Sequence, residues 1–408
     1  MRSHSMPDRL ASSRRRTVAI AMSLSGALLL GACATDDGAT VREIGTEDGS
    51  SASSSGSASG SGSASAPASG SGSASGTAVD GTAPEVEQVD GDGGYTYASD
   101  VSAHRLVVRD VCVINELRSA DPIDYDAIRE IYTDGVHSVN SDGSVRSVAG
   151  FATAEDRNNA VAATFDAATP LDDFVTAALD GEGIFADAGD GARAQGIAKG
   201  VQNQIMVAWT VHELNAAIDK AEAGELDADE GAPHNWDEAW AFYHGAEPGC
   251  APYATADSRA DNFGTATDDG TAQSNVAILA AMEAGRDALL EGDVDAAVAA
   301  REEILRNLIV TYTQASVRYA TVAAQDVAEG DLEAAAAHQA EGLAFFRVLR
   351  PLLADAGVDL STLDLTAIDA IYDLSAEPGT GDGDVVREAL APALAELGID
   401  DAEIGTLS

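Results

Sequence analysis

The chain has very little positive charge. It holds 23 lysine and arginine residues against 68 aspartate and glutamate residues, which gives a formal net charge of −45 at pH 7, and Lys199 and Lys220 are its only lysines. Nucleic acids and anionic lipid surfaces are bound through basic faces, so this balance argues against nucleic acid as a partner. The acidity is typical of adaptation to salt or of codon bias, and it would also concentrate cations at the surface.

Aromatic residues and catalytic motifs are also scarce. Phe, Trp and Tyr make up 5% of the chain, and strand-like alternating runs are rare, whereas alanine is abundant. The sequence contains no Gly-x-Ser-x-Gly elbow, no phosphate-binding glycine loop, no His-Glu-x-x-His motif and no calcium-loop spacing. We therefore expect an all-α fold, a helical bundle, and a protein that is not an enzyme.

Only three cysteines occur, and the first, Cys33, ends an export signal. An arginine-rich start is followed by an apolar run at 17–32 that is too short for a membrane span, so 1–32 is predicted to be a signal peptide. The run ends in Leu-Gly-Ala-Cys, which resembles a bacterial lipobox and predicts a lipid on Cys33. The alternative is an ordinary cleavage site followed by an incidental cysteine. Residues 33–94, rich in Ser, Gly and Ala, are predicted to be a disordered linker. We expect a lipid-anchored protein facing the periplasm or cell exterior.

The other two cysteines, Cys112 and Cys250, form an even pair in a chain that we expect to be exported. In an oxidising compartment such a pair most simply forms one disulfide. A metal site built from both thiols is the alternative, but neither cysteine lies in a Cys-x-x-Cys spacing.

From residue 95 to 408 the hydrophobic pattern is helical almost throughout. A weak internal repeat predicts two related halves, at about 120–250 and 270–400, which place Glu238 opposite Glu341 and Tyr132 opposite Tyr372. The expected helices cover 103–118, 125–133, 154–168, 171–180, 192–223, 272–291, 293–328, 331–355, 362–374 and 384–397.

The densest group of histidines and carboxylates lies at 212–245. Histidine beside carboxylate is typical of a metal site, and also of a capped helix packed on a core. His212 and Glu213 fall in the middle of a long helical pattern, so one of them must lie near its apolar side. Asp237 has the pattern of a solvated acid in a first turn. The predicted metal ligands here are His212, Glu213, His234 and Glu238.

Four further residues complete the predicted set of metal ligands. His338 and Glu341 lie three residues apart on a predicted helix, so both side chains can point to one side, as in metal-binding bundles. A surface His–Glu pair is the alternative. Tyr132 and Tyr372 are candidate phenolate ligands for a hard trivalent ion, with helix packing as the alternative.

The segments at 131–158 (IYTDG…SDGSVRSVAGFATAEDRN) and 211–245 (…APHNWDEAWAFYHG) resemble the low-iron-inducible periplasmic protein family of iron-assimilation proteins. This resemblance covers most of 100–400 and implies iron binding outside the cytoplasm, but it does not supply a ligand set. A second, local resemblance, at 338–346 (HQAEGLAFF), is to the imelysin-like proteins, which carry His-x-x-Glu; the accompanying glycine motif is missing here.

Together these features predict an iron-binding lipoprotein. We expect Fe³⁺ in preference to Fe²⁺, because Fe³⁺ favours oxygen ligands, and an anion that binds together with the metal. The expected partners are the membrane, through the lipid on Cys33, and a membrane component for iron uptake. The alternatives are a non-metal solute-binding or scaffold lipoprotein and an imelysin-like metal-dependent protein.

Overall fold

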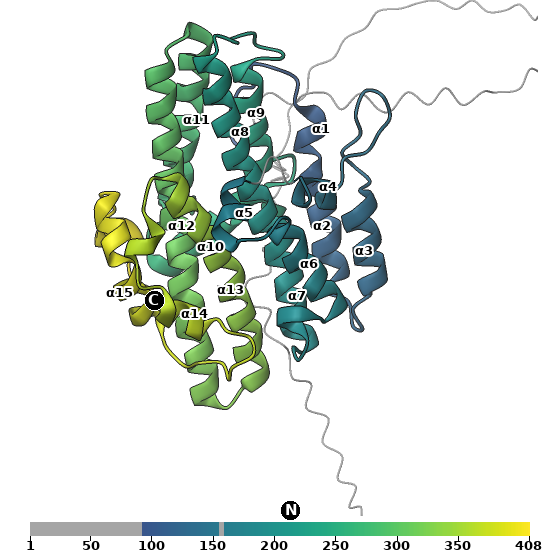
Figure 1. Ribbon diagram of the computed structural model, residues 1–408, viewed down its shortest axis with the longest axis vertical. Helices are drawn as coiled ribbons and strands as arrows, with labels where there is room; N and C mark the ends of the chain where they lie inside the picture. The colour runs from purple at the N-terminus through teal and green to yellow at the C-terminus, as the bar shows by residue number, and fades with distance from the viewer. Residues whose placement is uncertain (1–91, 155–158) are drawn as a thin grey trace, which may run out of the picture. The chain divides into compact units, whose positions relative to one another are not determined.

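A computed structural model describes residues 92–154 and 159–408. The predicted signal peptide, the predicted lipidation site Cys33 and nearly all of the predicted linker lie outside the described residues. The described part is all-α, as predicted, and forms no β-strand (Figure 1). Its helices before residue 225 are α1 (Ser102–Arg105), α2 (Val107–Leu117), α3 (Tyr125–Asp134), α4 (Val148–Ala152), α5 (Asn159–Phe165), α6 (Pro170–Asp180), η1 (Gly183–Phe185), α7 (Asp190–Lys199), η2 (Gly200–Ile205) and α8 (Met206–Glu222).

The remaining helices include the two longest in the described part of the chain, α12 and α13, which pack along each other (Figure 1). Asp293 caps the first and Asp331 the second, each by accepting a hydrogen bond from a main-chain amide of the first turn. Gly330, with φ of 85°, ends α12 directly before Asp331, which allows the tight reversal. These helices are α9 (Ala232–Tyr243), η3 (Pro248–Cys250), α10 (Pro252–Phe263), α11 (Gln273–Glu291), α12 (Val294–Glu329), α13 (Leu332–Asp355), η4 (Leu360–Thr362), α14 (Thr366–Ile371), α15 (Gly383–Glu396) and α16 (Asp401–Ile404).

The predicted helix at 192–223 is interrupted by a π-helical turn, η2, between α7 and α8. All six residues of this turn are buried. Gln202 donates a hydrogen bond to the carbonyl oxygen of Ala251 over 3.0 Å, and Asn203 accepts one from the Tyr312 hydroxyl over 2.8 Å. Side-chain contacts with other helices thus hold a turn that hydrophobic periodicity alone does not indicate.

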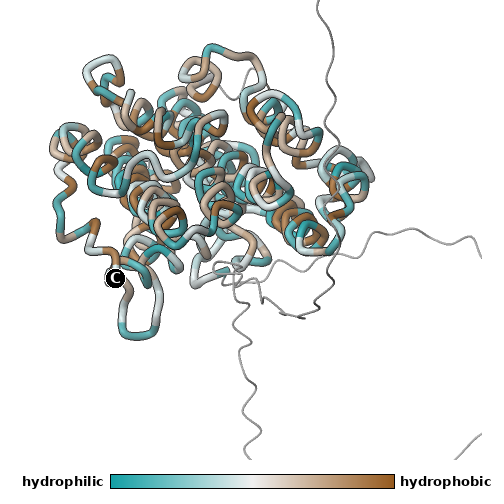
Figure 2. Tube along the Cα trace, turned by 90° about the horizontal axis from the view of Figure 1, so that it is seen from below, coloured by the Kyte–Doolittle hydropathy of each residue, from teal (hydrophilic) through white to brown (hydrophobic). Residues whose placement is uncertain are grey.

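Two large hydrophobic clusters form the core, and α9 contributes to both. Trp236, Trp240 and Tyr243 belong to the cluster shared with α8, α11, α12 and α13, whereas Phe242 belongs to the cluster shared with α2, α3, α6 and α7. The helices carry both hydrophilic and hydrophobic stretches along their turns, as helices that bury one side do (Figure 2). Because α9 is buried on nearly all sides, its polar side chains need partners inside the protein.

A disulfide lies beside the cluster shared with α2, α3, α6 and α7. Cys112 on α2 and Cys250 in η3 are bonded, with their Cα atoms 5.3 Å apart and 138 positions apart in sequence. This is the pair that the cysteine count predicts. No helix in residues 92–154 and 159–408 is long and apolar enough to cross a membrane.

Candidate functional site

Two histidines converge on one carboxylate where α1 meets α9, and we call His104, His234 and Glu238 the Glu238 cluster. His104 Nδ1 lies 2.9 Å from Glu238 Oε1, and His234 Nε2 lies 3.1 Å from the same oxygen. The side chains are 13%, 23% and 10% exposed for His104, His234 and Glu238, so the cluster is partly shielded yet open to small solutes. The pairing of His234 and Glu238 follows from their spacing of four on a helix.

The ring of His234 is held on its Nδ1 side by a short chain of hydrogen bonds. Its Nδ1 lies 2.9 Å from Ser99 Oγ. The Ser99 hydroxyl donates to Asp237 Oδ2 over 2.8 Å, and the same carboxylate accepts from the Ser99 amide and the Tyr95 hydroxyl. Because the Ser99 hydroxyl hydrogen is directed to Asp237, Ser99 Oγ accepts from Nδ1–H of His234. The neutral ring therefore presents the Nε2 lone pair to Glu238.

A lone pair facing a carboxylate oxygen at 3.1 Å requires a cation between the two atoms. A proton on Nε2 fills this role in the metal-free protein. Accordingly, the hydrogen bond to Glu238 raises the pKa of His234. Burial by itself would raise the pKa of Glu238, but hydrogen bonds from His104 and His234 outweigh it and hold that pKa well below its usual range.

Asp237 and Arg146 complete the surroundings of the cluster. The prediction from the sequence that Asp237 is a solvated first-turn acid is wrong, because the side chain is fully buried and burial raises its pKa. Arg146 is half-buried, acts on Glu238 through its charge, and has a buried Nη1 without a hydrogen-bond partner among the described residues. A guanidinium in this position offers a donor for an anion beside the cluster.

The other two predicted ligands of this region lie on α8. Glu213 is 2% exposed and accepts a hydrogen bond of 2.5 Å from Asn235 Nδ2. His212 packs its ring against Trp209 and places Nε2 3.9 Å from Glu213 Oε1. The second imidazole beside Glu238 comes instead from His104, which the sequence pattern does not indicate.

The second predicted pair, His338 and Glu341 on α13, has a different environment. His338 Nδ1 lies 2.6 Å from Asp326, and its Nε2 lies 4.0 Å from Glu341. Glu341 is 1% exposed, and Lys199 Nζ approaches Oε1 to 3.1 Å without the alignment of a hydrogen bond. Burial and the charges of Arg118 and Arg259 lower the pKa of Lys199, whereas Glu341 raises it. A metal bound at Oε1 of Glu341 would have to displace this ammonium group.

Tyr132 and Tyr372 are buried, and their hydroxyls are engaged as donors. Tyr132 donates to Asp172 over 2.7 Å, and Tyr372 donates to the carbonyl oxygen of Ser316. Burial raises the pKa of both hydroxyls above the ordinary tyrosine value. Neither hydroxyl bonds to a residue of the Glu238 cluster.

No group of three or more His, Cys, Asp or Glu side chains in the described part of the chain is already spaced to enclose a metal ion. In the Glu238 cluster, Nδ1 of His104 and Nε2 of His234 both form hydrogen bonds to Oε1 of Glu238. Replacing the protons of these bonds by a metal requires small side-chain shifts that separate the three donors. Two imidazoles and one carboxylate, with open positions left over, form a donor set typical of non-haem iron.

The comparisons with known proteins are consistent with this chemistry. A model of the low iron-inducible periplasmic protein family matches residues 69–408. No curated protein and no solved structure matches the chain. The match spans far more than half of the sequence and includes both histidine–carboxylate clusters, so the chain belongs to the low iron-inducible periplasmic protein family.

Proposed function

We propose that this protein binds iron outside the cytoplasm and contributes to its assimilation, with His104, His234 and Glu238 as the ligands. The observation that carries this proposal is the fixed direction of the His234 lone pair toward Glu238 Oε1, 3.1 Å away. Carboxylate-supported histidines are the usual way to orient an imidazole toward a metal. The family is described as low iron-inducible and periplasmic, which identifies iron as the metal to test first and an exported location as the setting.

Within this proposal the Glu238 cluster is favoured over His338 and Glu341. Its carboxylate is paired with two imidazoles, which are common ligands of iron. Glu341, by contrast, faces a buried ammonium group at 3.1 Å. His212, Glu213, His338 and Glu341 stay sequence-based predictions of metal ligands, and our proposal does not include them.

The oxidation state and the anion follow from the donor set. Our sequence-based prediction of Fe³⁺ included phenolate ligands, whereas two imidazoles with one carboxylate suit Fe²⁺ as well. We place the expected co-bound anion at Arg146, whose buried Nη1 has no hydrogen-bond partner among the described residues. An anion bridging Arg146 and the metal would supply additional oxygen ligands and favour the ferric ion.

We further propose that a lipid on Cys33 anchors the protein and that residues 34–94 tether the helical domain to the membrane. Iron bound at the domain would then be passed to a membrane uptake component. This role involves binding and transfer, and we assign no catalysis to it.

The test is a metal titration of the full chain, expressed without a histidine tag and purified with its disulfide intact. Isothermal calorimetry would follow Fe²⁺ under anaerobic conditions, Fe³⁺ supplied as citrate, and Zn²⁺, Mn²⁺ and Ca²⁺. We expect one stoichiometric iron site that survives physiological salt. Weak binding that is equal for all the divalent ions and lost in salt would indicate only an acidic surface. That result would favour the alternative function, a solute-binding or scaffold lipoprotein.

A further inference from the structure

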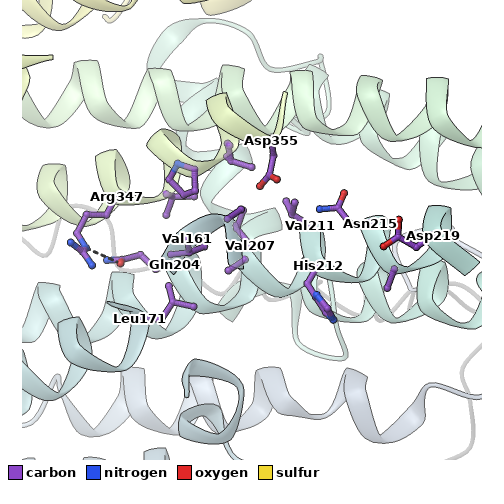
Figure 3. Close-up of a pocket in the computed structure, with 16 residues that line it drawn as sticks. Val161, Leu171, Gln204, Val207, Val211, His212, Asn215, Asp219, Arg347 and Asp355 are labelled. Atoms are coloured by element: carbon purple, nitrogen blue, oxygen red, sulfur yellow. Dashed lines mark hydrogen bonds between the residues drawn. The ribbon is translucent and has the colours of Figure 1, made fainter. Parts of the chain in front are cut away.

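A pocket of about 340 Å³ lies between α8 and α13, separate from the Glu238 cluster (Figure 3). Its volume falls within the range of natural small-molecule sites. Apolar side chains from four helices contribute to the lining of this pocket. These are Val161 of α5, Leu171 of α6, Val207 and Val211 of α8, and Val348 and Leu352 of α13.

One end of the pocket carries a partly buried cation without a carboxylate partner. Arg347 donates hydrogen bonds to Gln204 Oε1 over 3.2 Å and to the carbonyl oxygen of Pro170 over 2.8 Å, but forms no ion pair within the described residues. Burial lowers the pKa of Arg347 to about 10. Gln204 is 3% exposed, and its Nε2 is buried with no hydrogen-bond partner among the described residues. These side chains offer donors to an anionic group.

The part of the pocket away from Arg347 carries two carboxylates. Asp219 lies beyond the labelled valines, on the far side of the pocket from Arg347, and Asp355 lies between Val207 and Val211 along that direction (Figure 3). No hydrogen bond or ion pair is formed by the Asp355 carboxylate within the described residues, and burial raises its pKa to about 6, an effect that the charge of Arg301 opposes. Asn215, which accepts from Arg301 over 2.6 Å, lines the same part.

We propose that this pocket binds a small zwitterion whose carboxylate lies at Arg347 and Gln204 and whose ammonium group lies at Asp355 and Asp219. Arg347 and Asp355 are both on α13, about 12 Å apart along the helix axis. Because both side chains reach into the pocket, the charges of the ligand must be closer than this and joined by an apolar chain. The chemical class is a linear ω-amino acid, free or as part of a larger solute.

The proposal is tested by calorimetry with the full chain and straight-chain ω-amino acids: 4-aminobutanoate, 6-aminohexanoate and 8-aminooctanoate. Octanoate and octylamine, which carry one charge each, serve as ligand controls. We expect saturable binding that is tightest at one chain length and at least about tenfold tighter than either control. Absence of saturable binding, or octanoate or octylamine binding as tightly as the best ω-amino acid, would overturn the proposal.

Three variants assign the two ends. Asp355→Asn should weaken the best ω-amino acid at least about tenfold and leave octanoate unchanged, whereas Arg347→Gln should weaken both. Arg350→Gln is the matched control, because Arg350 pairs with Asp369 and does not line the pocket. If Arg347→Gln fails to fold, the near-isosteric Asp355→Asn still decides, since unchanged affinity in that variant contradicts the assignment. Iron binding should be the same in Asp355→Asn as in the unmodified chain, so either proposal can fail alone.

Discussion

At the scale of single residues, Asp237 determines which ring nitrogen of the neutral His234 carries the hydrogen. It receives the hydroxyl hydrogen of Ser99, and Ser99 therefore receives the Nδ1 hydrogen of His234. None of these atoms would need to touch the metal. The site thus depends on a buried residue behind the ligand as much as on the ligand itself.

Replacing Asp237 with Ala should remove this constraint. Without the carboxylate as acceptor, the Ser99 hydroxyl is free to donate to Nδ1 of His234, and the ring hydrogen then lies on Nε2, where it blocks the metal. We expect iron affinity to fall by about 10–100-fold. Nitrogen NMR of His234 would report the tautomer, and helical circular dichroism should be unchanged. An unchanged tautomer with full iron affinity would contradict the role assigned to Asp237.

The raised pKa of His234 and the lowered pKa of Glu238 give iron binding a defined pH dependence. The metal must displace the proton on Nε2, so affinity should fall as the pH drops through the raised pKa of His234. The stability of the metal-free protein should change in the opposite direction, falling as the pH rises over that range. Its imidazolium–carboxylate pair is fully formed below the ordinary histidine pKa of about 6.5 and is lost as the pH rises through the raised value.

Urea unfolding of the metal-free chain across this pH range would measure the effect, with His234→Asn as the control. We expect the difference in unfolding free energy between the two proteins to shrink as pH rises. The lowered pKa of Glu238 contributes stability that is present above its ordinary value and is lost only in strong acid, as the pH falls through the lowered value. A difference that grows with pH would show that Glu238 does not stabilise the protonated form of His234.

His104 shows why part of the site escaped the sequence analysis. It lies in the four-residue helix α1, and its contact with Glu238 joins segments far apart in the chain. No local spacing signals such a contact. His234 and Glu238, in contrast, are four apart on one helix, so their pairing could be predicted from spacing.

At the scale of elements, α9 is positioned by a close approach to α11. The indole of Trp236 lies over Gly285 and donates to the carbonyl oxygen of Met282 over 2.8 Å. A methyl group at position 285 would overlap the ring. Any shift of Trp236 would move the helix that carries His234 and Glu238.

Gly285→Ala should therefore destabilise the fold by about 1–3 kcal/mol, although alanine is the better helix former. Gly191→Ala in α7 is the matched control, because a methyl group there meets only the side chain of Ala337 at an ordinary 3.7 Å. The control should be neutral or slightly stabilising. Thermal and urea unfolding would compare the two variants, and equal stability would show that the interface between α9 and α11 can yield.

The long helices could be predicted because their periodicity and their capping residues agree. Asp293 and Asp331 begin α12 and α13, and Gly292 and Gly330 end α11 and α12, close to the predicted limits. The helix α10 was missed because its small and polar residues give little periodicity. The π-turn η2 was missed because tertiary hydrogen bonds hold it.

At the scale of the whole molecule, the disulfide closes a long loop whose residues contribute to both core clusters. With 138 positions between Cys112 and Cys250, cross-linking removes much of the freedom of the unfolded chain. Reduction, or the double substitution of both cysteines by alanine, should lower the unfolding free energy by about 4 kcal/mol. Urea unfolding with and without reductant would measure this. Identical unfolding midpoints would mean that the bond does not constrain the unfolded state.

The central claim, that iron binds at Glu238, is tested most directly by the iron affinity of Glu238→Gln. This variant keeps the shape of the side chain and removes the charge that both histidines face. Glu341→Gln, measured in the same titration, is the matched comparison. The account predicts that Glu238→Gln loses at least about a hundredfold in iron affinity while Glu341→Gln stays close to the unmodified chain. The reverse pattern would contradict it and place the iron beside His338.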